Sequence, residues 1–172
     1  MLLNIILVLV LAICFVTDLK EQKIYNKVIF PSLAIAVVLQ GVYSGYDGLR
    51  VSLLGFTVGL GILLVPYLFG GFGAGDVKLL ALIGAIKGSV FVLNTALYMA
   101  VIGGIISLVI IICHKQTLDF FKQLGLWVFY SIYGIRTKLE TPSAPFLKKY
   151  PYGVAIAGGA LICLFFKGAW VI

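Results

Sequence analysis

The stretch GFGAGDVKLL, residues 72–81, separates two apolar runs and places a carboxylate, Asp76, between a glycine-rich turn and the second run. The protein has only six acidic residues in a chain of 172, so an acid at this boundary needs a physical reason. Apolar runs without two-residue alternation lie on both sides of the turn, which favours helices over strands. The first question is therefore which solvent surrounds those helices.

The composition excludes water as the main solvent of the folded chain. Hydrophobic residues make up 62% of the sequence and charged residues 11%, against about 45–50% and about 25% in soluble domains. We therefore predict an all-α integral membrane protein in the lipid bilayer. The excess of basic residues, 13 Lys and Arg against 6 Asp and Glu, indicates loops that face an anionic membrane surface. No nucleic-acid partner is expected.

Six apolar segments can be marked, at residues 2–17, 28–46, 51–69, 77–90, 91–112 and 151–170. A span needs about 20 residues; the first and fourth segments are short, and Lys87 and Gly88 lie at the end of the fourth. We predict about six transmembrane helices in one membrane-embedded domain, residues 1–172. An alternative merges residues 77–112 into one long tilted helix and leaves five spans.

The distribution of basic residues predicts the orientation of the spans. With the N-terminus outside, most Lys and Arg fall on the inner side, chiefly after the first span and in residues 113–150, as the positive-inside rule requires. Five spans would move residues 113–150 outside, so the charges favour six. Within that segment, residues 117–134 mix aromatic and polar residues as an interfacial helix does. This helix, between the fifth and sixth spans, would be a lid, a substrate-docking surface or a simple connector.

The three cysteines, Cys14, Cys113 and Cys163, form no Cys-x-x-Cys pair. Neither a zinc site nor a disulfide framework is therefore indicated, and we expect these residues to pack as small apolar groups. The first apolar run has no basic residue before it, so we interpret it as a retained span and not as a signal peptide.

Two carboxylates lie at the inner ends of predicted spans, Asp18 after the first and Asp76 after the third. Acids at such places are costly unless they are paired or hydrated. Two carboxylates brought close together share a proton, so that one can deprotonate a water and the other polarise a scissile carbonyl. Gly73 and Gly75 would let an extended peptide approach the loop. The alternative is that Asp76 caps the next helix.

Two stretches together resemble the type IV prepilin peptidase family, the Gly-x-Gly-Asp type of membrane aspartic protease. In DLKEQKIYN, residues 18–26, the spacing matches the family pattern of Asp, five residues, then Ile-Pro-Asn, with Tyr25 in place of Pro. GAGDVK, residues 73–78, matches Gly-x-Gly-Asp-x-Lys. YPYGVAIAGGAL, residues 150–161, looks like the family's Pro-[Phe/Tyr]-Gly entry to the last helix.

The resemblance implies that Asp18 and Asp76 are the catalytic pair. The residues implied to shape the loop or lie near the substrate are Gly73, Gly75, Lys78, Ile24 and Asn26; Lys78 could instead be only one of the inner basic residues. The implied activity removes the basic leader of prepilins or pseudopilins at the cytoplasmic face of the cell membrane, with no metal or organic cofactor. Larger members carry a methyltransferase region with paired Cys-x-x-Cys motifs, so cleavage without N-methylation is expected here, as in the compact peptidases of tight-adherence (Flp-type) pili.

Two other functions are consistent with parts of the sequence. The presenilin and signal-peptide-peptidase type also uses Gly-x-Gly-Asp, but its partner would be Tyr46–Asp47, which the span 51–69 places on the opposite face from Asp76. A transporter or scaffold subunit could use Asp18 and Asp76 as ion or proton sites, although such acids are expected near mid-membrane. The sequence does not predict the oligomeric state.

Overall fold

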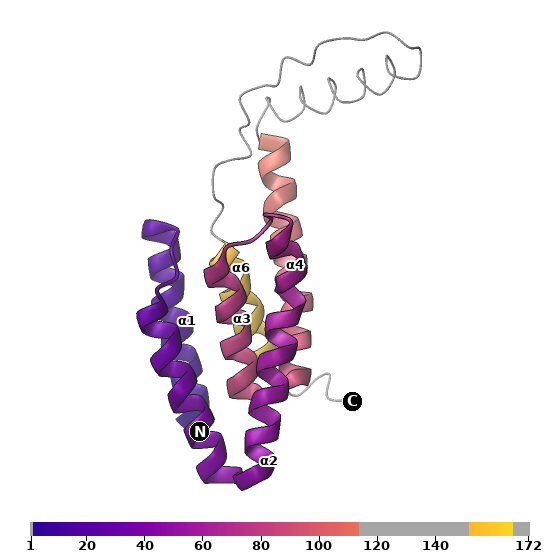
Figure 1. Cartoon of the computed structure of the whole chain (residues 1–172). Coiled ribbons are helices and arrows are strands. Elements are labelled where there is room, and N and C mark those ends of the chain that lie inside the picture. The colour runs from indigo at the N-terminus through magenta and orange to yellow at the C-terminus, as the bar shows by residue number, and fades with distance from the viewer. Residues whose placement is uncertain (1, 114–151, 167–172) are drawn as a thin grey trace. The chain divides into compact units, whose positions relative to one another are not determined.

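The computed structural model describes residues 2–113 and 152–166. All regular secondary structure in this part of the chain is helical, which confirms the all-α prediction. The helices are α1 (Leu2–Glu21), α2 (Asn26–Leu68), α3 (Ala74–Lys87), α4 (Ser89–Cys113) and α6 (Tyr152–Phe165) (Figure 1). The tertiary contacts reported below lie within residues 2–103 and 152–166. The expected interfacial helix lies outside the described residues, and the single domain stays a prediction.

Helix α2 is a hairpin of two helical arms. Its 43 residues would measure about 64 Å if straight, roughly twice the thickness of a bilayer core. The chain reverses at Gly45, whose φ of 58° and ψ of −136° are not helical, and Figure 1 shows the two arms running in opposite directions. Gly48 lies directly against the backbone carbonyl of Gln40 on the other arm, so a side chain there would push the arms apart. The two arms match the predicted segments 28–46 and 51–69.

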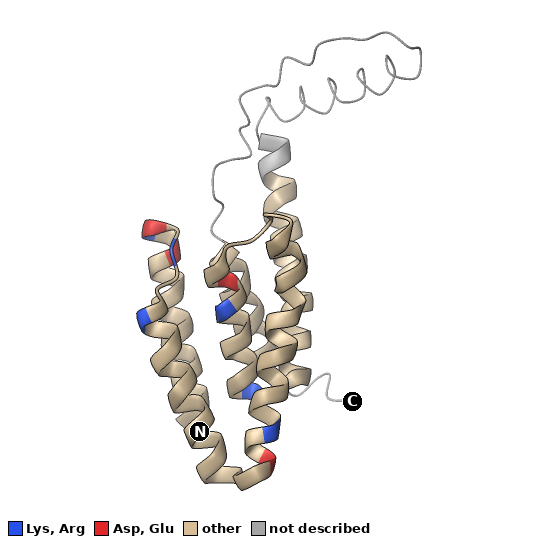
Figure 2. Cartoon of the chain, viewed as in Figure 1, with Lys and Arg blue, Asp and Glu red and all other residues tan. Residues whose placement is uncertain are grey.

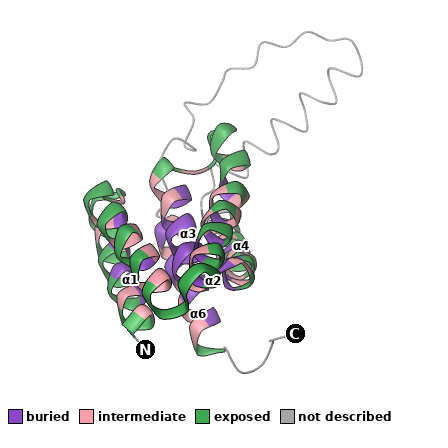
Figure 3. Cartoon of the chain, turned by 60° about the horizontal axis from the view of Figure 1, so that its bottom comes forward, coloured by how far each residue is buried: buried purple, intermediate pink, exposed green. Residues whose placement is uncertain are grey.

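Helix α3 is the centre of the bundle. Every residue from 79 to 86 is buried, and Figure 3 shows the buried residues concentrated on this helix and on the faces turned towards it. A helix that is apolar all round needs neighbours on all sides. Gly55 of α2 meets the backbone of Gly84, and Gly59 meets that of Leu80 and Ala81. These glycines allow backbone-to-backbone packing of α2 on α3.

Helices α3 and α4 are separated at Gly88. This residue has a φ of 89°, in the left-handed region that glycine adopts without strain. Helix α3 ends at Lys87, and α4 begins at Ser89. The alternative of one helix over residues 77–112 is therefore wrong, because the backbone leaves the helical conformation at that glycine.

Helix α6 packs in the bundle although it is the last helix in the described part of the chain. It contacts α1 and α3, and its Gly159 lies against the backbone of α4, where an added Cβ would be 2.8 Å from the Thr95 oxygen and 2.8 Å from the Met99 nitrogen. Helix α6 therefore links the first helix to the later ones.

Three described helices are long and apolar enough to cross a membrane, namely α1, α2 and the part of α4 from Ser89 to Val109. Helix α6 is apolar but shorter. Figure 2 shows the charged residues gathered at the two ends of the bundle, with a long uncharged stretch between them. Exposed apolar residues cover the outside of the helices, as expected where lipid replaces water.

Candidate active site

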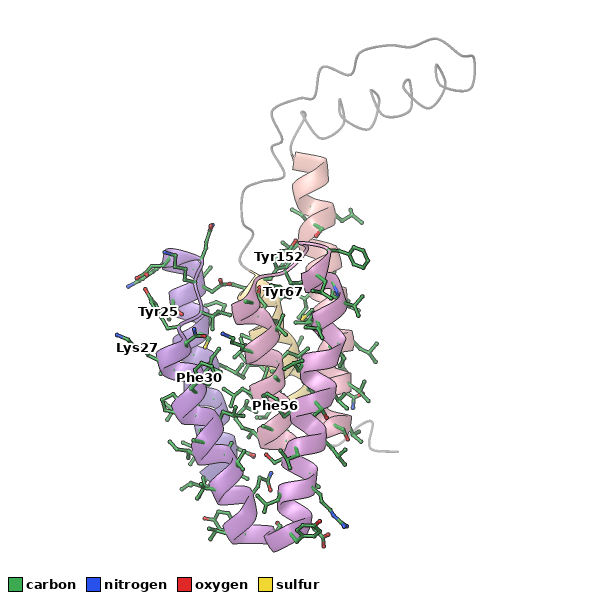
Figure 4. The ribbon with its side chains drawn as sticks, viewed as in Figure 1. Tyr25, Lys27, Phe30, Phe56, Tyr67 and Tyr152 are labelled. Carbon is green, nitrogen blue, oxygen red and sulfur yellow. The ribbon has the colours of Figure 1, made fainter. Side chains whose placement is uncertain are left out.

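The candidate site lies where four chain segments meet at one end of the bundle. They are the end of α1, the beginning of α2, the glycine loop with the first turn of α3, and the beginning of α6. Tyr25 and Tyr152, labelled in Figure 4, lie at this end. The three sequence motifs of the chain therefore converge in space.

Asp18 lies in the last turn of α1 with only 5% of its surface exposed. The helix ends just beyond it, where Gln22 adopts a φ of 51° and its amide donates to the Asp18 carbonyl at 2.9 Å. The Asp18 side chain turns towards α6, where its atoms lie against Gly153. The end of the apolar helix α1 thus carries a buried carboxylate.

Asp76 is the third residue of α3 and is 8% exposed. Its Oδ2 accepts a hydrogen bond of 3.0 Å from the amide of Gly73, so the carboxylate stabilises the start of its own helix. The capping role considered from the sequence is therefore present. It does not exclude chemistry, because a carboxylate has two oxygens and several acceptor positions.

Gly75 and Ile24 bring the glycine loop against the segment that follows Asp18. A Cβ added at Gly75 would lie 2.9 Å from the Ile24 Cβ and 3.5 Å from the Ile24 carbonyl oxygen. Only glycine allows this approach without displacing the neighbouring segment. The second glycine of Gly-x-Gly-Asp is thus explained by a contact with the other motif.

Lys78 and Asn26 make a second connection between the two motifs. The Lys78 Nζ donates to the Asn26 Oδ1 at 2.9 Å and lies 5.4 Å from the centre of the Phe30 ring, within the range of a cation–π contact. The Lys78 ammonium group therefore joins α3 to the start of α2.

Tyr25 occupies the position where the family pattern has Pro. Its φ of −80° and ψ of 127° are close to the backbone conformation that proline adopts, so the turn keeps its geometry. The Tyr25 hydroxyl donates a hydrogen bond to Glu21. This bond to the Glu21 carboxylate raises the pKa of Tyr25, and the phenol therefore stays neutral and remains a donor.

Helix α6 contributes residues that sequence reasoning left out of the site. The rings of Phe72 and Tyr152 lie 4.7 Å apart at an interplanar angle of 45°, so the glycine loop packs on the first residue of α6. Gly153 follows directly and contacts Asp18. The signal that could have found them was the Tyr-Gly pair of the third motif, which marks the same turn.

Within residues 2–113 and 152–166, no group of three or more His, Cys, Asp or Glu side chains could hold a metal ion. A cavity of about 760 Å³ lies away from the two aspartates, beside the opposite end of α3. Its lining includes Lys87, Phe91, Asn94, Tyr98 and Cys163. It shares no residue with the converging motifs and is not part of the candidate site.

These features define a helical membrane protein with two buried carboxylates at one end of its bundle. The model of the type IV leader peptidase family matches residues 5–108, and the chain belongs to this family. The resemblance stated from the motifs is thereby confirmed, and the protein is a protease with a leader-peptidase type of function. Comparisons with curated proteins and with solved structures gave no match.

The matched range includes both aspartates and all five of the residues that the resemblance implied around them. It ends before α6, so the contacts of Tyr152 and Gly153 come from the structure. Prepilin-type substrates follow from the family.

Proposed function

We propose that the protein is an aspartic endopeptidase that removes the basic leader of prepilins or pseudopilins, with Asp18 and Asp76 as the catalytic pair. One observation carries this proposal: the segments that hold the two acids, far apart in the sequence, are joined by the Gly75–Ile24 contact and the Lys78–Asn26 hydrogen bond. Both carboxylates are also buried, where an acid without a role is expensive.

The chemistry follows from two carboxylates acting on one water and one carbonyl. The ionised partner takes a proton from the attacking water, while the protonated partner donates a hydrogen bond to the scissile carbonyl. The proton then moves to the leaving amine. This reaction needs no metal or organic cofactor, and glycine at positions 73 and 75 leaves room for an extended peptide beside Asp76.

The proposed membrane arrangement has about six spans, with the N-terminus outside and the aspartates at the cytoplasmic face. The two arms of α2 support separate spans at residues 28–46 and 51–69, and the break at Gly88 supports separate fourth and fifth segments. The same end of the bundle holds Lys20, Lys23, Lys27 and Lys78, which supports an inner location under the positive-inside rule.

Cleavage without N-methylation is part of the proposal. None of the three cysteines of the chain forms a Cys-x-x-Cys pair, and such pairs mark the methyltransferase region of larger members. The mature pilin would then keep an unmethylated N-terminus, a state that mass spectrometry of the product distinguishes from the methylated one by the mass of a methyl group.

The test is prepilin cleavage in membranes that contain the wild type, Asp18→Asn or Asp76→Asn. Asparagine keeps the shape of the side chain and removes the titrating proton, so each variant should lose roughly 10³-fold or more of the cleavage rate. Asp47→Asn is the matched control, because this third described aspartate is exposed and lies at the other end of the bundle.

The amount of inserted protein must be equal in all four samples. Full cleavage by both Asp18→Asn and Asp76→Asn would refute the dyad. Proton- or ion-dependent flux in reconstituted vesicles, lost in the same variants, would then identify an ion site in place of a protease site.

A further inference from the structure

The side chain of Asp18 is enclosed by the first turn of α6. A Cβ added at Gly153 would lie 2.7 Å from the Asp18 Oδ2, 2.9 Å from its Cγ and 3.1 Å from its Cβ. The first two distances are below 3.0 Å, which real Cβ atoms essentially never show, and the third is tighter than most such contacts. The absence of a side chain at position 153 is therefore a condition for the observed place of the carboxylate.

The first turn of α6 also presents donors to that carboxylate. The Asp18 carboxylate lies against Gly153 in that turn, and its buried Oδ2 makes no hydrogen bond within the described residues. Amides at a helix beginning have no partner in their own helix, and the helix dipole favours a negative charge there. The first turn of α6 thus offers amides beside the Asp18 carboxylate.

The same turn is fixed to the loop that precedes Asp76. The Tyr152 ring packs at a tilt against that of Phe72, which lies four residues before Asp76 in the glycine loop. Residue 152 therefore contacts the segment of one acid and residue 153 contacts the other acid. Helix α6 is the described element that touches both sides of the site in this way.

We propose that Gly153 is a positioning residue, which seats the Asp18 carboxylate against the first amides of α6 at a fixed place relative to the loop of Asp76. The inference rests on the proposed function, since it assigns to α6 the placement of one member of the catalytic pair. Gly153 acts through Asp18 and takes no part in bond making. Displacement of a reacting group by about 1 Å can cost about 10²-fold in rate.

Three glycines of α6 provide a matched test. Gly153→Ala would push against Asp18, Gly159→Ala would push against the backbone of α4, and Gly158→Ala would meet only the flexible end of Ile102 at 3.2 Å. We expect Gly153→Ala to lower kcat per folded molecule about 10- to 100-fold. Gly159→Ala should lower the yield of folded protein but keep kcat within about threefold, and Gly158→Ala should stay within about twofold of the wild type.

The pH–rate profile separates positioning from general damage. Displacement of the Asp18 carboxylate from the first amides of α6 would remove groups that stabilise its ionised form, so the acidic limb of the Gly153→Ala profile should move to higher pH. A smaller fraction of folded enzyme, as in Gly159→Ala, lowers the rate without moving the profile. The other titratable or charged groups of this end of the bundle, which all three variants keep, are Cys14, Lys20, Glu21, Lys23, Tyr25, Lys27, Asp76, Lys78 and Tyr152.

A double-mutant cycle tests the contact even if Gly153→Ala is inactive or folds poorly. In the wild-type background Gly153→Ala should lower the melting temperature by about 2–6 °C. In the Asp18→Ala background the contacts at 2.7 Å and 2.9 Å are absent and only the Cβ contact at 3.1 Å remains, so the shift should be clearly smaller. Equal shifts in both backgrounds would overturn the contact.

The proposal and the proposed function fail in different ways. If Gly153→Ala keeps the wild-type kcat and pH profile while Asp18→Asn abolishes cleavage, the positioning role is refuted and the protease function stands. If Asp18→Asn cleaves as well as the wild type, the catalytic role of Asp18 fails, and with it the reason to place its carboxylate.

Discussion

The first turn of α3 and the rest of the same helix differ in how they are held. Residues 79–86 are wholly buried and apolar, and Gly84 meets the backbone of Gly55. Residues 74–78 carry the buried Asp76 and the half-exposed Lys78. They are connected to the chain after Asp18 by the Gly75–Ile24 contact and by the hydrogen bond and cation–π contact of Lys78. One helix thus has a tightly packed body and a lightly held polar end.

The difference shows how a membrane protein can place a polar site with few polar contacts. The body of α3 is fixed by backbone packing, and the Gln40 side chain donates to the Ile86 carbonyl at 2.9 Å near its far end. A helix fixed over most of its length carries its first turn to a defined place, as a rigid support does for a functional site. The contacts at the polar end then adjust the site and contribute little to the fold.

The largest effect should come from breaking the body of the helix. In Gly84→Leu the new side chain would overlap the Gly55 carbonyl, and we expect a loss of more than about 3 kcal/mol of stability. Both the yield of folded protein and prepilin cleavage should fall together. Thermal unfolding in detergent and cleavage in membranes measure the two quantities on the same preparations.

Gly61→Leu is the control for that substitution, because nothing lies within 4 Å of a Cβ at Gly61. It adds the same side chain to α2 at an exposed position. A stable and active Gly84→Leu protein would show that the body of α3 is not held by backbone packing.

An intermediate effect should come from the polar end. Lys78→Met removes the donor to Asn26 and should cost about 0.5–1.5 kcal/mol of stability. Cleavage per folded molecule should fall about fivefold, as expected when about 1 kcal/mol of transition-state stabilisation is lost. The measurement is a double-mutant cycle with Asn26→Ala, in which the two losses should not add.

Lys27→Met removes an exposed charge from the same end of the bundle and serves as the control. If Lys78→Met and Lys27→Met lower cleavage equally, Lys78 acts only through the inner positive charge. Additive losses in the cycle would likewise show that the bond to Asn26 has no part in the site.

The smallest effect should come from a charge pair outside both parts of α3. Arg50 lies 4.0 Å from Asp47, and the two side chains are 63% and 89% exposed. Such pairs contribute little, so Arg50→Ala should change stability by less than about 0.5 kcal/mol and cleavage by less than twofold. A loss of cleavage above tenfold, measured at equal protein, would mean that the far end of the bundle takes part in the reaction.

The motifs predicted more of the site than of the packing. The family spacing alone assigned the motif of Asp18, Ile24 and Asn26 and the motif of Gly75 and Lys78 to one site. The structure brings the segments of these two motifs together. Spacing works here because each motif occupies one helix end and the helix ends meet. The helical class followed directly from the apolar runs.

The remaining features depend on contacts between residues distant in sequence. The backbone packing of Gly55 on Gly84 could not be predicted, since glycine is common in membrane helices for several reasons. The contact of Gly153 could not be predicted either, because it is made with the side chain of Asp18 on another helix. The reversal at Gly45 was foreseen only as a gap between two spans.

The contact between Asp18 and α6 can form only late in the synthesis of the chain. Asp18 is made near the start of the chain and Gly153 near its end, and a ribosome makes the chain in that direction. A partly synthesised molecule can hold the α2–α3 packing and the connection from Lys78 to Asn26, but not the enclosure of Asp18. On our proposal, proteolytic competence therefore arises only when α6 has inserted, and a ribosome stalled before it leaves an inactive protein.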